Sequence, residues 1–178
     1  MALSWKRRLT GLCLEDEALG RQVHGQKRRE VKKMTDLEKI EVAKLIATIA
    51  HRGQRDKSGV PYITHPEKVA SLLDTPQEKI VGYLHDTVED TSVEIEDIRG
   101  FFGDEIADAV ALMTHADGEK YMDYVRRLAK NPLARRVKMA DLTHNMDISR
   151  IRNPKQKDYD RIRLKYKPAY EYLKSLDT

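Results

Sequence analysis

Four ionisable side chains lie close together in the middle of the chain, at His85, Asp86, Glu89 and Asp90. On a continuous helix, residues four apart share a face, so His85 would lie over Glu89 and Asp86 over Asp90. An apolar stripe of Ile80, Val81, Leu84 and Val88 runs beside them. Burying such groups is costly unless a partner compensates their charge. A divalent cation would do so, whereas a solvated acidic helix end is the alternative.

Two other segments supply candidate ligands. Asp141 lies beside an apolar stripe in residues 137–151, so we expect it to be buried, and a buried carboxylate is usually paired or bound to metal. An aspartate satisfied by arginine, or capping a neighbouring helix, is the alternative and in isolation the more frequent case. His65 follows residues 61–64 at an expected helix start, where a cap or a surface histidine is the more common role.

Taken together, His65, His85, Asp86 and Asp141 offer two imidazoles and two carboxylates. This mixture of nitrogen and oxygen donors suits Mn²⁺, Fe²⁺ or Zn²⁺ better than Ca²⁺, and Mn²⁺ is our first choice. The single cysteine, Cys13, excludes an internal disulfide and a cysteine-rich zinc site. A lone cysteine also fits a reducing cytoplasm, where we expect the protein to act.

The composition favours one helical domain. The chain has 178 residues, of which 40% are hydrophobic, 6% aromatic and 35% charged. No stretch approaches the roughly 18–20 apolar residues of a membrane span, so no membrane partner is expected. The net charge of +4 is uneven, because residues 1–34 hold nine Lys or Arg against four Asp or Glu. We expect residues 1–34 to be a basic, solvated or poorly ordered extension rather than a nucleic-acid-binding arm, and 35–178 to form the domain.

The positioning elements read as helices throughout, which predicts an all-α, compact multi-helix fold. We expect capping boxes at Thr64–Glu67 and Thr91–Glu94, and a helix that starts at Pro76 and delivers His85 and Asp86. The expected helices cover 36–53, 64–73, 76–90, 91–103, 104–115, 119–130, 132–151 and a basic C-terminal segment from Asn153.

With these motifs in view, the chain resembles the HD-domain metal-dependent phosphohydrolases. The closer resemblance is to the hydrolase domain of RelA/SpoT proteins and to stand-alone small alarmone hydrolases. The matching segments keep the family's order and span roughly residues 36–151. They are residues 50–54, 59–66, 85–91, 102–103 and 138–146.

The resemblance implies a function and a set of roles. A cation held by the four donors would lower the pKa of a bound water, which Glu89 and Asp90 would orient or deprotonate. The substrate would be guanosine 3′,5′-bis(diphosphate) (ppGpp), a nucleotide of the stringent response, and the products GDP and pyrophosphate. Lys57, Ser58 and Asn145 match nucleotide-binding positions. His51 and His144 are expected to support the site without binding the metal.

Two departures leave other functions open. The family usually has arginine where this chain has Asp56, and often a basic residue where it has Asp147. These changes suggest altered base recognition, so an HD phosphohydrolase acting on another phosphorylated nucleotide is the second hypothesis. A third is a non-catalytic nucleotide or nucleic-acid binding module, although such a module would not need Glu89 and Asp90. Its motivation is a series of basic residues: Arg150, Arg152, Lys155, Lys157, Arg161, Arg163, Lys165 and Lys167.

Overall fold

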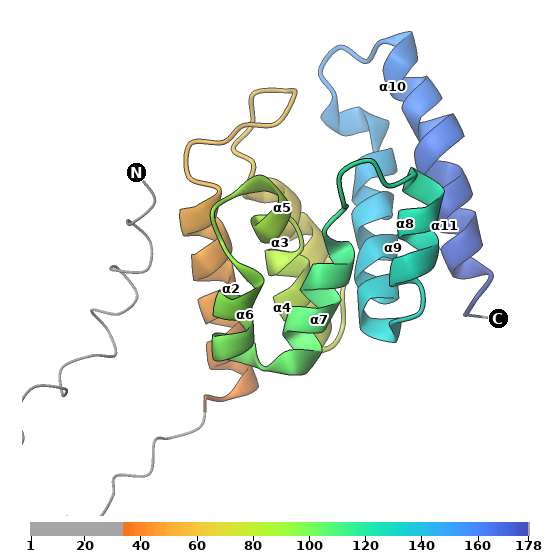
Figure 1. The fold of residues 1–178 in the computed structure, drawn as a ribbon. Helices are drawn as coiled ribbons and strands as arrows, with labels where there is room; N and C mark the ends of the chain where they lie inside the picture. Colours follow the sequence, from red (N-terminus) through yellow and green to blue (C-terminus); the bar gives the residue numbers. More distant parts are fainter. Residues whose placement is uncertain (1–33, 178) are drawn as a thin grey trace, which may run out of the picture. The chain divides into compact units, whose positions relative to one another are not determined.

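The computed structural model describes residues 34–177, which fold into helices joined by short loops (Figure 1). This part of the chain has no β-strand, only an isolated antiparallel bridge between Arg55 and Pro61. The all-α prediction is therefore confirmed. The predicted extension lies almost wholly outside the described residues, so the domain boundary stays a prediction. The α-helices are α2 (Asp36–Ala50), α3 (Thr64–Ser71), α4 (Pro76–Leu84), α5 (Thr87–Asp90), α6 (Ile95–Phe102), α7 (Asp104–Met113), α8 (Tyr121–Leu128), α9 (Pro132–Met146), α10 (Gln156–Arg161) and α11 (Lys167–Lys174).

Helix α4 lies at the centre of the packing, against α2, α3, α7 and α9 (Figure 1). Its Ile80, Val81 and Leu84 side chains are almost completely buried. On the far side of α9, α11 buries Ala169 and Leu173. Helices α4 and α9 pack against each other, and His85, which follows α4, and Asp141 within α9 are both buried.

Gly82 sets the approach of α3 to α4. A Cβ atom built on Gly82 would lie 2.8 Å from Leu73 Cδ1 and 3.2 Å from Ala70 Cα. A real Cβ essentially never comes that close, so the two helices pack at this distance because residue 82 has no side chain. The close contact lies one turn before His85 and brings α3, which carries His65, next to it.

His85 and Asp86 lie between two helices, so the expected continuous helix to residue 90 is wrong. Helix α4 ends at Leu84 and α5 starts at Thr87. The end of α4 is satisfied by side chains, because Thr87 Oγ1 donates to Leu84 O (2.7 Å) and His85 Nδ1 lies 2.8 Å from Gly82 O. The helical i, i+4 bond from Asp90 N to Asp86 O survives at 3.0 Å, so these two residues still share a side.

Both predicted capping boxes are wrong. The Thr64 hydroxyl donates to Pro61 O (2.9 Å), and Ile63 holds the N-cap position of α3. The Thr91 hydroxyl donates to Thr87 O (2.5 Å), and α6 begins only after Glu94. In each case the threonine bonds backward to the preceding turn instead of capping the next helix.

A capping box that the sequence analysis missed precedes α4. Thr75 Oγ1 accepts from Glu78 N (3.3 Å), and the Glu78 carboxylate accepts from Thr75 N (3.0 Å). The start of α4 at Pro76 is as expected.

Irregular helical turns follow α9, which ends at Met146 rather than at residue 151. Asp147 Oδ1 accepts from Ser149 N (3.0 Å) and opens the 3₁₀ helix η1 (Ile148–Arg150). The C-terminal helix starts at Gln156, and a π-helical turn, η2 (Ile162–Tyr166), separates α10 from α11. Within residues 34–177, none of the helices combines the length and apolar character needed to cross a membrane.

Candidate metal centre and adjoining cavities

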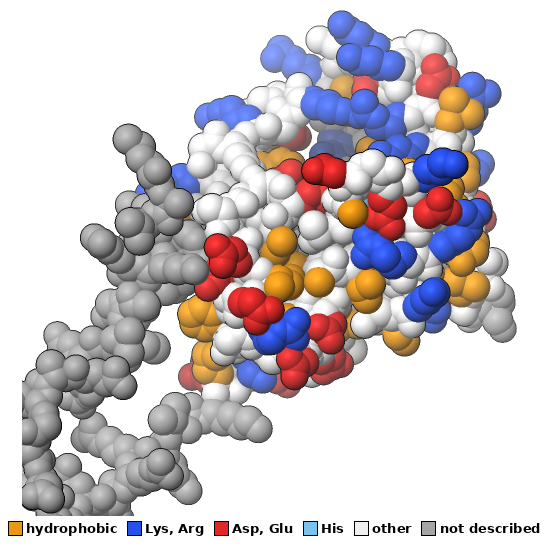
Figure 2. Space-filling view, in the orientation of Figure 1, with side chains coloured by type: hydrophobic (Ala, Val, Ile, Leu, Met, Phe, Trp, Pro, Cys, Tyr) orange, Lys and Arg blue, Asp and Glu red, His pale blue; other side chains and the backbone are white. Residues whose placement is uncertain are grey.

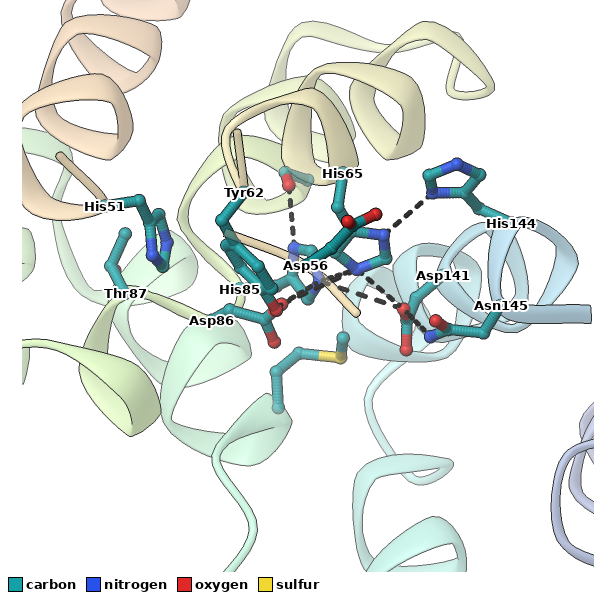
Figure 3. Close-up of polar contacts among 12 residues, drawn as sticks. His51, Asp56, Tyr62, His65, His85, Asp86, Thr87, Asp141, His144 and Asn145 are labelled. Atoms are coloured by element: carbon teal, nitrogen blue, oxygen red, sulfur yellow. Dashed lines mark hydrogen bonds and ion pairs between the residues drawn. The ribbon is translucent and has the colours of Figure 1, made fainter. Parts of the chain in front are cut away.

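The four predicted metal ligands converge, although they come from three separate parts of the chain (Figure 3). His65 Nε2 lies 3.2 Å from His85 Nε2, 3.1 Å from Asp141 Oδ1 and 3.5 Å from Asp86 Oδ2. His85 Nε2 lies 3.1 Å from Asp86 Oδ2 and 3.9 Å from Asp141 Oδ1. Ligands about 2.1 Å from one ion and about 90° to 109° apart would be about 3.0–3.4 Å from each other. Three of the five spacings fall in this range, and the other two, at 3.5 and 3.9 Å, are longer. His65, His85 and Asp141 are thus close enough together to hold a single ion, with Asp86 beside them.

The hydrogen bonds on the far side of each imidazole orient both rings for metal binding. His85 Nδ1 faces the carbonyl of Gly82, an acceptor, so this nitrogen carries the proton. His65 Nδ1 lies 2.8 Å from His144 Nδ1 and can donate to it. Both Nε2 atoms then present lone pairs to each other and to two carboxylates. Four acceptors facing one point require a positive charge there, which a cation supplies.

The charges in the centre shift the pKa values of His85 and Asp141 in opposite directions. Burial would lower the pKa of His85, but the charge of Asp86 and the hydrogen bond to it raise the value to about 9. Burial would raise the pKa of Asp141, but Lys138 and His65 hold it well below its usual value. Both directions reflect the close approach of opposite charges in the interior.

Three neighbouring side chains fix the two carboxylates. The Tyr62 hydroxyl donates to Asp86 Oδ2 (2.5 Å). Asn145 Nδ2 donates to Asp141 Oδ1 (2.5 Å), and Lys138 Nζ lies 2.9 Å from Asp141 Oδ2. Asn145, predicted to bind nucleotide, thus also orients a candidate ligand. Such supporting groups set the geometry of a metal site.

Histidines 51 and 144 lie outside the four-donor cluster, as expected. The pKa of His144 is lowered to about 4 by burial and by the charge of Arg150, so the ring is a neutral acceptor beside His65. His51 is buried and its Nδ1 lies 2.7 Å from Gln54 Oε1. Gln54 Nε2 in turn donates to Asp90 O (2.9 Å).

Glu89 and Asp90 line a cavity of about 260 Å³ that opens beside the candidate ligands, and which we call the metal-side cavity. Glu89 Oε2 accepts from the backbone N–H of His115 (2.9 Å), which fixes its carboxylate. The pKa of Asp90 is raised, first by burial and then by the charge of Asp86. A carboxylate with a raised pKa is a stronger base than an ordinary aspartate.

A second cavity of about 280 Å³, which we call the basic cavity, adjoins the first. Its wall includes the predicted nucleotide-binding residues Lys57 and Ser58, together with Arg161. Figure 2 shows Lys and Arg side chains gathered around a hollow at the top of this view. The two cavities share part of their lining, so one elongated ligand can occupy both. The shared residues are Tyr62, Asn145, Arg150 and Tyr166.

The acidic residues of the basic cavity are engaged by nearby groups. Asp56 Oδ1 accepts from Ser58 N (2.8 Å) and Val60 N (3.0 Å), and its Oδ2 lies 3.9 Å from Arg150 Nη2. Asp147 caps η1, and Asp158 Oδ2 accepts from Lys155 N (3.0 Å). These carboxylates hold turns together. Lys57 and Arg161 line the same cavity. Because the neighbouring carboxylates are engaged in these turns, they oppose the binding of an anion to Lys57 and Arg161 less than the sequence suggested.

Sequence reasoning missed the inward placement of several C-terminal residues. The sequence predicts Arg150, Arg161 and Lys165 as parts of a basic helix that could bind nucleic acid, yet they line the two cavities. Tyr166 lines both cavities and carried no role. Asn153-Pro154 does mark a break in the sequence before this segment. The hydrophobic periodicity of the sequence, however, cannot predict a π turn.

The chain is similar to several curated proteins. The chain is 42% identical over 123 residues to a GTP pyrophosphokinase of Streptomyces coelicolor, which is 62% of this chain and 14% of the relative. It is 39% identical over 111 residues to a probable guanosine-3′,5′-bis(diphosphate) 3′-pyrophosphohydrolase of Synechocystis, covering 54% of this chain and 15% of that protein. It is 33% identical over 127 residues to the bifunctional (p)ppGpp synthase/hydrolase SpoT of Escherichia coli, covering 62% of this chain and 18% of SpoT. The match thus spans less than a fifth of these relatives.

A solved structure shares the fold. It is described as a metazoan orthologue of SpoT that hydrolyses ppGpp and plays a role in starvation responses. The match has a TM-score of 0.65 and 24% identity, and covers 76% of this chain and 85% of the other. Residues 43–165 also match the family described as the HD domain. This segment contains all four converging side chains, and the chain belongs to the HD-domain family.

Proposed function

We propose that this protein is a divalent-metal-dependent phosphohydrolase that converts ppGpp to GDP and pyrophosphate. The observation that carries the proposal is the convergence of four acceptors, from His65, His85, Asp86 and Asp141, with both imidazoles oriented by outer hydrogen bonds. The hydrolase names among the relatives supply the substrate.

In this proposal the four side chains hold the metal. Mn²⁺ is the first choice and Fe²⁺ or Zn²⁺ the alternatives, since the donors are nitrogen and oxygen. A divalent cation there would lower the pKa of a bound water and polarise a phosphoryl oxygen. Lys138 would offset part of the charge of Asp141, and Tyr62 would keep Asp86 in place.

Glu89 and Asp90 would handle protons in the metal-side cavity. The water oxygen bonds to the phosphorus next to the 3′ oxygen, and the bond from that phosphorus to the 3′ oxygen breaks. The 3′ oxygen gains a proton, and the water's other proton stays on pyrophosphate or passes to solvent. Asp90, whose pKa is raised by burial and by Asp86, would accept one proton from the water and pass that proton to the departing 3′ oxygen. Such transfer typically contributes 10²–10⁴-fold.

The nucleoside part would lie in the basic cavity, against Lys57, Ser58 and Asn145. Lys57 carries a positive charge there, while the Ser58 hydroxyl donates to Arg150 O (3.0 Å) and steadies that wall. Because Asn145 lines both cavities, it would lie at the join between nucleoside and diphosphate.

The test is release of pyrophosphate from ppGpp with Mn²⁺, Fe²⁺ or Zn²⁺ supplied to metal-stripped protein. We expect turnover by the wild type and none by Asp86→Ala. Asp117→Asn, which changes an exposed loop aspartate, is the control. Equal release by the wild type and Asp86→Ala would refute the proposal.

A second candidate is hydrolysis of another phosphorylated nucleotide. It is favoured by Asp56, which lines the basic cavity where the family usually has arginine. A nucleotide panel with the preferred metal separates the two. Faster turnover of a substrate other than ppGpp would favour the second.

A further inference from the structure

The π turn η2 changes which residues of the C-terminal helix face the cavities. The backbone N–H of Lys167 bonds to Ile162 O, five residues back, so this turn holds one residue more than an α-helical turn. In such a turn residues four and five apart lie near each other. Arg161 and Tyr166 consequently face the basic cavity, while Lys165 and Tyr166 line the metal-side cavity. Single π turns frequently occur at functional sites.

Lys165 brings a positive charge to the wall of the metal-side cavity. Its ammonium lies 4.2 Å from the centre of the Tyr121 ring, which supports it by a cation–π contact. Among residues 34–177, no carboxylate oxygen forms an ion pair with it. Partial burial, followed by the charges of Lys138 and Arg161, lowers the pKa of Lys165, although Glu89 opposes this. Repulsion from the neighbouring cations would be relieved when an anion binds between them.

The Tyr121 hydroxyl offers a donor at the same wall. It is buried and has no hydrogen-bond partner among the described residues. Burial raises the pKa of Tyr121, so the hydroxyl keeps its proton and can donate. A buried donor without an acceptor is destabilising, and an arriving anion oxygen would supply the missing acceptor.

We propose that Lys165, carried by the π turn and supported on the Tyr121 ring, binds the pyrophosphate group of the substrate and of the product. This proposal rests on the proposed function, because it assigns the leaving diphosphate to the metal-side cavity. The Tyr121 hydroxyl is the second donor of this subsite. Lys57 and Arg161, which line only the basic cavity, remain for the other end of the nucleotide.

The test measures the affinity of the protein for inorganic pyrophosphate in two ways, with Mn²⁺ in excess. One is the inhibition of ppGpp hydrolysis by pyrophosphate, and the other is direct binding measured by calorimetry. Lys165→Met keeps the apolar stem on the Tyr121 ring but removes the charge. We expect it to weaken pyrophosphate binding at least about tenfold, since a charge-assisted hydrogen bond is lost. Lys167→Met, two residues along on an exposed part of α11, should bind like the wild type.

Tyr121→Phe separates binding from folding. Removing an unpartnered buried hydroxyl should leave the unfolding temperature of the free protein unchanged or higher, while pyrophosphate binding weakens several-fold. A purely structural role for Tyr121 predicts no change in pyrophosphate affinity. Unchanged affinity in both Lys165→Met and Tyr121→Phe would overturn the subsite.

The direct binding measurement distinguishes this failure from failure of the proposed function. If the wild type binds pyrophosphate and Lys165→Met does not, the subsite stands even if ppGpp is not hydrolysed. If the wild type hydrolyses ppGpp and Lys165→Met binds pyrophosphate equally well, only the subsite is refuted.

Discussion

The metal centre and the basic cavity are neighbours built in different ways. His65, His85 and Asp141 are almost completely buried, and they come from the ends of helices that form the core. The basic cavity is lined by a loop, a 3₁₀ turn, the short helix α10 and a π turn, with Asn145 at the end of α9. The comparison indicates that packing in the core positions the candidate metal ligands. Mostly irregular segments, in contrast, form the surface of the basic cavity, where a ligand would be selected.

Removing a candidate ligand should have the largest effect. We expect Asp141→Asn to reduce turnover by about 10³-fold or more, because a neutral amide is a poorer metal ligand than a carboxylate and leaves Lys138 without its partner. Steady-state kinetics at several Mn²⁺ concentrations measure the loss, with Asp117→Asn as the control. Turnover within tenfold of wild type would mean that the centre does not carry the chemistry.

Disturbing the packing under the centre should have the next largest effect. Gly82→Ala introduces a Cβ close to Leu73 and Ala70, and we expect a loss of about 1–3 kcal/mol in the free energy of unfolding. Gly100→Ala in α6 is the matched control, since its Cβ would meet nothing within 4 Å and should be neutral or stabilising. Urea denaturation compares them. Equal stabilities would show that the centre does not depend on this contact.

Changes in the basic cavity should affect binding more than chemistry. Lys57→Met removes a charge that lines only that cavity, so we expect KM for ppGpp to rise about tenfold while kcat stays within about twofold. Lys68→Met on the exposed side of α3 is the control. A large fall in kcat with unchanged KM would contradict the proposal that the basic cavity contributes to binding and the candidate metal centre to the chemical step.

The smallest effect concerns the cap that starts α4. Hydrogen bonds from Thr75 and Asp74, helped by Arg136, lower the pKa of Glu78 below its usual 4.5, although burial opposes this. The ionised Glu78 carboxylate therefore contributes its full stabilisation of the fold above about pH 5. This contribution is lost as the pH falls through the lowered pKa of Glu78 in the folded protein. Glu78→Gln should cost about 1 kcal/mol at pH 7 and progressively less in acid. A difference that does not change with pH would exclude the charged cap.

The sequence predicted the all-α fold and the residues that converge at the metal centre. The burial of Asp141 and His85 could be predicted because both lie beside apolar stripes whose burial follows from periodicity, while their role as metal ligands stays a prediction. The sequence-based prediction misplaced the break at His85 and the start of α6, because Thr87 and Thr91 bond to nearby carbonyls in a way that periodicity does not reveal. Lys165 was missed because one extra residue in a helical turn rotates all that follows.

The short bridge from His51 through Gln54 to the carbonyl of Asp90 spans the two regions. Gln54 lies at the entrance to the segment that carries Lys57, and residues 55 and 61 close that segment into a loop. A nucleotide that displaces the loop would also pull on the backbone of the proposed base. Under the proposed function, a nucleotide that fits this loop poorly would therefore be expected to react more slowly as well as to bind more weakly.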